Sequence, residues 1–149
     1  MLDGRPDGTD PGSAPTARQV REAEDVARNA VSVGVAELLH QCVDVLRAAR
    51  SAIGVAGTIT TVAMVALDLE QWVDGRAHGE AMSAATVHAI TRRLTASTAD
   101  QIAAITGIAP GRRDVITAGA IVLDQVMDVL GLAQITISES DSLDGLVAT

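Results

Sequence analysis

Residues 51–58 have the sequence SAIGVAGT, a run of small and apolar side chains that leads directly into helix-forming sequence. The run lacks the alternation of a half-buried strand, and this is typical of a parallel strand covered on both faces. Thr58 is predicted to cap the following helix, because apolar residues recur at helical spacing over 59–65. We therefore expect a buried strand over 51–57, a tight turn and a helix that begins at Thr58.

A strand, a glycine turn and a helix start together form a site for anions. The free amides of the first helical turn point out from the carboxyl end of the strand, and the helix dipole favours negative charge there. Gly54 and Gly57 would let a ligand or another backbone come close. Many strand-to-helix turns carry a glycine for backbone reasons alone, so an ordinary turn is the alternative interpretation.

The composition limits the core and the partners. Hydrophobic residues make up 48% of the 149 residues, yet the chain has no Phe or Tyr, so the core must be built from aliphatic and Met side chains. The net charge of -8 argues against nucleic acid, because a protein that binds a phosphate backbone presents a basic face. The single cysteine cannot form an internal disulfide, and no segment suits a signal peptide or a membrane span. We expect a cytoplasmic protein that binds neither nucleic acid nor membrane.

The N-terminal third is predicted to be an arm followed by a helix. Residues 1–15 contain Gly, Pro, Asp and Ser with little to bury, and we expect them to be disordered. Thr16 is predicted to cap a long helix that is interrupted at Gly34 and followed by a shorter helix near 43–49.

Periodicity predicts helices and one more strand in the rest of the chain. The expected helices cover 83–97, 98–105 and 115–130, with Gly131 closing the third, and a last helix starts at Asp141 or Ser142. The β-branched stretch 134–138 is predicted to be the second strand. Two strands separated by helices indicate a parallel pair with a right-handed crossover, which is too little sheet for a closed domain. The sequence therefore predicts a piece of a larger α/β domain, or a subunit that a partner completes.

Two arginines precede the 115–130 helix. Arg112 and Arg113 lie in the turn that starts at Pro110, where the local field of the helix opposes positive charge. An anion held between them would relieve that repulsion.

The motifs together resemble the C-terminal part of the exopolyphosphatase and guanosine pentaphosphate phosphatase (Ppx/GppA) family. The likeness covers roughly residues 15–149, and the matching motifs occur in the family's order and spacing: IGVAGTITT (53–61), HG (78–79), PGRRDVITAGA (110–120), ISE (137–139) and DGL (144–146).

The resemblance implies a fold and a reaction. Residues 16–149 would be a helix-rich partial second domain of an actin-like ATPase (RNase H-like) fold, with two parallel strands and the first three strands of the domain missing. The reaction would be hydrolysis of a phosphoanhydride, with release of orthophosphate from polyphosphate or guanosine pentaphosphate and with Mg²⁺ as cofactor.

The resemblance also implies roles for particular residues. Gly57 and Thr58 would contact phosphate through the turn and the hydroxyl, and Arg112 would supply a guanidinium. His78, Gly79 and Glu139 would shape the wall of the cleft. The family's glycine-rich loops and the catalytic acid of its first domain do not occur in this sequence. No catalytic residue or metal ligand is therefore assigned, and the chain is expected to be incomplete and inactive alone.

Three functions stay open at this point. The chain could belong to a phosphoanhydride hydrolase, completed by an N-terminal segment or by self-association; it could be a non-catalytic module that binds phosphate or nucleotide; or it could be a truncated fragment. The coding sequence upstream discriminates between them, because the two missing glycine-rich loops there would favour the hydrolase.

Overall fold

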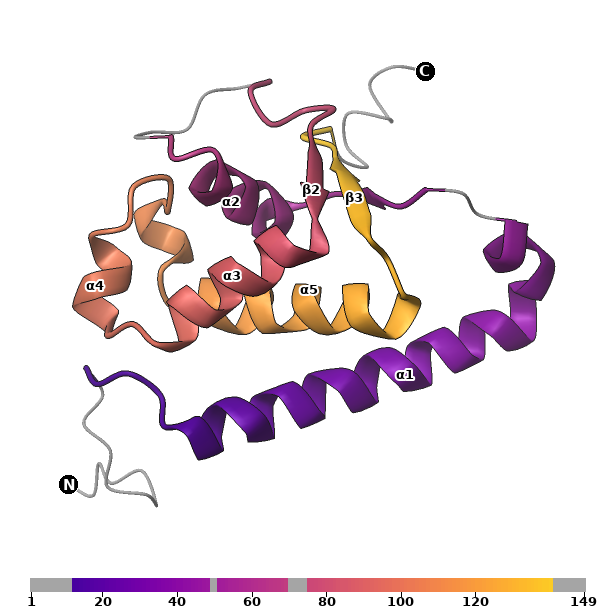
Figure 1. The fold of residues 1–149 in the computed structure, drawn as a ribbon, viewed down its shortest axis with the longest axis horizontal. Helices are drawn as coiled ribbons and strands as arrows, with labels where there is room; N and C mark the ends of the chain where they lie inside the picture. The colour runs from indigo at the N-terminus through magenta and orange to yellow at the C-terminus, as the bar shows by residue number, and fades with distance from the viewer. Residues whose placement is uncertain (1–11, 49–50, 70–74, 141–149) are drawn as a thin grey trace.

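The computed structural model describes residues 12–48, 51–69 and 75–140, with the backbone alone over 42–48. The elements, shown in Figure 1, are α1 (Ala17–Ala48), β1 (Ile53–Gly54), α2 (Gly57–Ala66), β2 (Ala81–Ser83), α3 (Ala84–Thr95), α4 (Ala99–Ala103), the 3-10 turn η1 (Pro110–Arg112), α5 (Ile116–Leu130) and β3 (Gln134–Ile137). Most of the predicted arm and the predicted terminal helix lie outside the described residues.

Helix α5 lies at the centre of the molecule. It packs against α1, α2 and α3, and Figure 1 shows α1 running beneath α5 and continuing past its end. The core is aliphatic and methionine-rich, as the composition predicts, and its largest fully buried side chains are Met64, Leu94, Ile116, Met127, Val62 and Val87.

The described strands form one small mixed sheet in the order β1-β3-β2. Strand β1 runs parallel to β3, with Gly54 opposite Ile137, which confirms the predicted parallel pair. The prediction of two strands was incomplete, because β2 pairs antiparallel with β3 and places Met82 opposite Ile135. The sequence AMS of β2 contains no β-branched residue, so its pairing with β3 rather than local propensity makes it a strand.

Strand β1 is shorter than predicted. Only Ile53 and Gly54 are paired, and the chain leaves the sheet before Gly57, where α2 already begins. Because β1 has β3 as its one neighbour among the described strands, its other edge is open there, and Ile53 and Val55 keep 67% and 47% of their surface exposed.

Helix α1 continues through Gly34 over 32 residues, so the predicted interruption is wrong. A glycine inside a helix costs about 1 kcal/mol relative to alanine and does not break it, and this segment contains no proline. Two capping predictions, at Thr16 and at Gly131, are confirmed. Thr16 and Gln19 exchange hydrogen bonds at the start of α1, and Gly131 ends α5 in the left-handed conformation.

None of the helices in the described ranges combines the length and the apolarity that a bilayer span requires.

Candidate anion site at the start of helix α2

The turn between β1 and α2 has an unusual backbone. Ala56 has φ 74° and ψ 168°, a region that is almost exclusive to glycine and that costs a residue with a β-carbon about 1–3 kcal/mol. The Ala56 carbonyl nevertheless accepts the first helical hydrogen bond, from Thr60 N at 3.3 Å. The strained residue therefore forms the link between β1 and the first turn of α2.

The hydroxyls of the first turn bond to its own carbonyls. Thr60 Oγ1 donates to the carbonyls of Ala56 and Gly57, each at 3.3 Å, and Thr61 Oγ1 donates to the Gly57 carbonyl at 2.6 Å. The predicted cap at Thr58 is wrong: Ala56 occupies the N-cap position, and no side chain caps the helix. The first amides of α2 have no acceptor within the helix, and no side chain of the described residues caps them.

Arg112 lies directly against this turn. A β-carbon built at Gly57 would fall among the guanidinium atoms Nη1, Nη2 and Cζ of Arg112. The 3-10 turn η1 presents the arginine, and it is held by hydrogen bonds from Arg112 N to Ala109 O (2.9 Å) and from Val115 N to Arg112 O (3.1 Å). The structure thus brings together Gly57 and Arg112, which the sequence separates by more than fifty residues.

Thr58 packs against α5. A β-carbon built at Gly119 would lie 2.8 Å from both Oγ1 and Cγ2 of Thr58. In the part of the chain that the structure describes, the Thr58 hydroxyl has no hydrogen bond. Sequence reasoning did not single out Gly119, because a glycine within an apolar helix shows its role only through the residue that packs on it.

His78, Gly79 and Glu139 form a second cluster. The Glu139 carboxylate accepts hydrogen bonds from Gly75 N (2.5 Å) and Ala77 N (2.7 Å), and Glu139 N donates to His78 Nδ1 at 3.2 Å. Gly79 N donates to the Ile137 carbonyl at 2.8 Å. These bonds tie the 75–79 loop to the end of β3, so both Glu139 oxygens already serve a structural role.

The two clusters share one edge of the sheet. Because β1 and β3 are parallel, their carboxyl ends lie together, and Ser138 N donates to the Gly54 carbonyl at 2.8 Å. Glu139 directly follows Ser138, which is hydrogen-bonded to β1, and Gly57 lies just after the end of β1. In doubly wound α/β folds this edge is where ligands bind.

A metal ion finds few ligands here. Within the described ranges no group of three or more His, Cys, Asp or Glu side chains could hold one. Glu139, the carboxylate at the edge of the sheet, already accepts two amide hydrogen bonds. The described residues therefore do not fit a Mg²⁺ site, and no chemical step is assigned to the ion.

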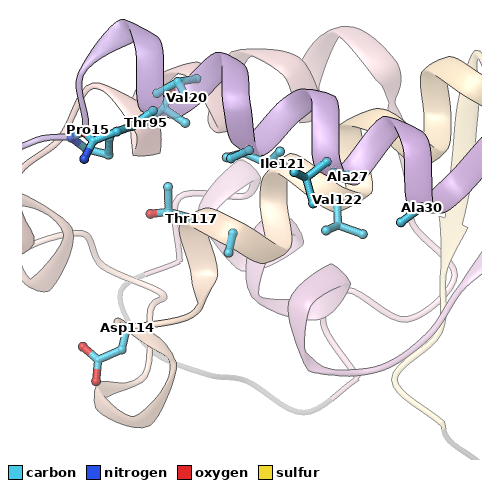
Figure 2. Close-up of a pocket in the computed structure, with 13 residues that line it drawn as sticks. Pro15, Val20, Ala27, Ala30, Thr95, Asp114, Thr117, Ile121 and Val122 are labelled. Carbon is cyan, nitrogen blue, oxygen red and sulfur yellow. The ribbon is translucent and has the colours of Figure 1, made fainter. Parts of the chain in front are cut away.

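A separate groove of about 550 Å³ lies between α1 and α5. Figure 2 shows Val20, Ala27 and Ala30 on one wall and Ile121 and Val122 on the other. The predicted phosphate-binding residues do not line this groove. Its apolar walls do not suit a polyanion, so the turn at the start of α2 stays the candidate anion site.

Comparison with known proteins identifies the family of this chain. The sequence profile described as the Ppx/GppA phosphatase family matches residues 10–148. Exopolyphosphatase 2 of Mycobacterium tuberculosis is 36% identical over 105 residues, which are 68% of this chain and 33% of that protein. A bifunctional 3-dehydroquinate synthase/phosphatase of Fusobacterium nucleatum is 31% identical over 113 residues, which are 76% of this chain and 17% of that protein.

Solved structures show the same fold. An exopolyphosphatase-like protein superposes with a TM-score of 0.77 at 28% identity, over 94% of this chain and 44% of its own. The type II variant of the Aquifex aeolicus Ppx/GppA phosphatase gives a TM-score of 0.76 at 16% identity, over 93% of this chain and 42% of its own. The chain thus spans less than half the length of each, and it is a helix-rich partial α/β domain of their fold. By its sequence and its fold, the chain belongs to the Ppx/GppA phosphatase family.

Proposed function

We propose that this chain supplies the phosphate-holding part of a phosphoanhydride hydrolase of the exopolyphosphatase type. The terminal phosphate of polyphosphate or of guanosine pentaphosphate would bind where α2 begins. The observation that carries the proposal is the guanidinium of Arg112 lying on Gly57, the first residue of α2. A guanidinium next to free helix amides is complementary to a phosphate in both charge and geometry.

The groups of this turn would act by holding and orienting the substrate. The amides of Gly57 and Thr58, the Thr58 hydroxyl and the Arg112 guanidinium would bond to non-bridging phosphate oxygens. Phosphoryl transfer relies mainly on positioning and on neutralisation of the phosphate charge, and a preformed cradle supplies both.

Activation of the attacking water would fall to residues beyond this chain. The Glu139 carboxylate lies at the carboxyl ends of β1 and β3, on the same side of the sheet as the candidate site. Its oxygens already accept hydrogen bonds from the amides of Gly75 and Ala77. Because the chain spans 33% of the mycobacterial exopolyphosphatase that it matches, we propose that a complementing segment provides the base and the metal ligands.

A non-catalytic phosphate-binding module is the second candidate. The same occupied carboxylate favours it, since a turn with donors and no free base binds an anion without hydrolysing it.

Two assays on the purified chain test the proposal. Binding is measured by titration with phosphate and with short polyphosphate, and hydrolysis by orthophosphate release from polyphosphate and guanosine pentaphosphate in the presence of Mg²⁺. We expect binding without measurable turnover, because loss of a general base and its positioning costs several powers of ten in rate. Turnover that disappears in Thr58→Val or Arg112→Ala would show that the chain is complete as a catalyst. Failure to bind either ligand would contradict the proposed function.

A further inference from the structure

We propose that Gly119 is a positioning residue for the anion site. The side chain of Thr58 packs against Gly119, and this contact sets the register, that is, the position of the first turn of α2 relative to Arg112. This inference rests on the proposed function only for the ligand, since the register itself is a property of the free protein.

The contact between Gly119 and Thr58 leaves no room for a side chain. A β-carbon at residue 119 would be 2.8 Å from Oγ1 and from Cγ2 of Thr58, and 3.4 Å from its Cβ. Both branches of the threonine thus face α5. A threonine in a helix is limited mainly to two side-chain rotamers, so Thr58 has little freedom to withdraw.

Helix α5 cannot easily move away from this contact. The residues around Gly119 that are packed in the core are Ile116, Ala120 and Ile121, all buried. The Ala120 carbonyl accepts a hydrogen bond from Thr91 Oγ1 of α3 at 3.2 Å, which fixes this turn of α5 from the opposite helix. A side chain at residue 119 would therefore displace the start of α2 rather than α5.

The same segment carries Arg112. Val115 N donates to the Arg112 carbonyl at 3.1 Å, and Gly119 N donates to the Val115 carbonyl at 2.9 Å, so hydrogen bonds run continuously from η1 into α5. This unit touches α2 at two successive residues: Arg112 lies on Gly57, and Gly119 receives Thr58. The paired contacts fix where the guanidinium stands relative to the free amides.

An anion bound by amides and guanidinium together depends on that register. A phosphate needs donors from both elements within hydrogen-bond reach at once, and misplacement of one set by about 1 Å weakens a site of this kind strongly. Gly119 thus acts on phosphate through Thr58, without touching the ligand.

The test compares Gly119→Ala with Gly34→Ala, a helix-interior control in α1 where an added β-carbon meets nothing within 4 Å. In the free proteins, Gly119→Ala should shift the amide resonances of Gly57 and Thr58, and Gly34→Ala should leave them in place. With inorganic phosphate as the probe, Gly119→Ala should raise the Kd by about tenfold or more. The double variant Thr58→Ala with Gly119→Ala should have the same Kd as Thr58→Ala alone, because Thr58→Ala removes Oγ1 and Cγ2, the two atoms close to residue 119.

Opposite outcomes would overturn the inference. Gly119 would be only a packing residue if Gly119→Ala lowered the urea midpoint while the resonances of residues 57 and 58 and the phosphate Kd kept their wild-type values. If Gly119→Ala does not fold, Thr58→Ser with Gly119→Ala retains one close atom instead of two, and its Kd must exceed that of Thr58→Ser alone. If the wild-type protein does not bind phosphate, the proposed function fails, and the resonances of the free variants still decide the role of Gly119.

Discussion

The guanidinium of Arg112 occupies the space that a side chain at residue 57 would need. This relationship connects η1 to the first residue of α2, and it places a permanent positive charge where the helix dipole already favours anions. A side chain added at residue 57 should displace the guanidinium without disturbing the fold, because the guanidinium is the far end of a flexible and exposed side chain.

Gly57→Ala should therefore remove the arginine from the site without harming the fold. We expect the variant to bind phosphate as weakly as Arg112→Ala, and the double variant to be no weaker than either, since both changes remove the same contact. Isothermal titration of the three variants measures this. Gly111→Ala is the matched control, because a β-carbon there meets nothing within 4 Å. Additive losses would mean that the two residues act independently.

Ala56→Gly should stabilise the protein. Glycine adopts φ 74° without strain, so the free energy of unfolding should rise by about 1 kcal/mol in urea denaturation. Ala89→Gly, at an exposed position within α3, should lower it by about 1 kcal/mol for the usual reason of helix propensity. A decrease in both variants would show that the Ala56 backbone carries no relievable strain.

Glu139→Gln tests whether this carboxylate anchors the loop at residues 75–79. A glutamine offers one oxygen, so either Gly75 N–H or Ala77 N–H would face an amide donor, and stability should fall by about 1–2 kcal/mol. Amide exchange at Gly75 and Ala77 should accelerate. Glu80→Gln is the control, since Glu80 takes part in an exposed ion pair at 3.9 Å with Arg76 and should change stability by less than about 0.5 kcal/mol. Unchanged exchange at residues 75 and 77 would leave the carboxylate free for another role.

The open edge of β1 should make the isolated chain self-associate or pack loosely. Ile53 is 67% exposed on a strand that has one neighbour among the described strands, and such an edge pairs readily with another chain. Ile53→Lys should reduce the associated fraction in light scattering, whereas Leu130→Lys, at the exposed end of α5, should not. A monodisperse wild-type monomer with strongly protected amides over 53–56 would contradict the open edge.

Sequence reasoning identified the features that are encoded locally. Helices were predicted to start at Ser83 and at Thr98. In the structure Ser83 accepts a hydrogen bond from Thr86 N at the start of α3, and Thr98 forms a capping box with Gln101 at the start of α4. The parallel pair was also predictable, because its strands are apolar or β-branched.

Features that depend on distant contacts were not predictable. Strand β2 exists because β3 lies beside it, and nothing in the residue type indicates the positive φ of Ala56. Nδ1 of the exposed His88 on α3 lies 3.2 Å from Oδ2 of Asp124, a buried carboxylate on α5. The strand pairing and the His88–Asp124 contact each join two distant segments, and the sequence of one segment does not specify them.

The most direct test of the central claim is a phosphate titration of the wild-type chain, followed through its amide resonances. We expect saturable shifts at Gly57 and Thr58 that disappear in Arg112→Ala and persist in Arg92→Ala, a change of an exposed arginine in the last turn of α3. An anion site at this turn is contradicted if the resonances of Gly57 and Thr58 stay in place while other residues respond, or if Arg92→Ala abolishes the shifts as completely as Arg112→Ala.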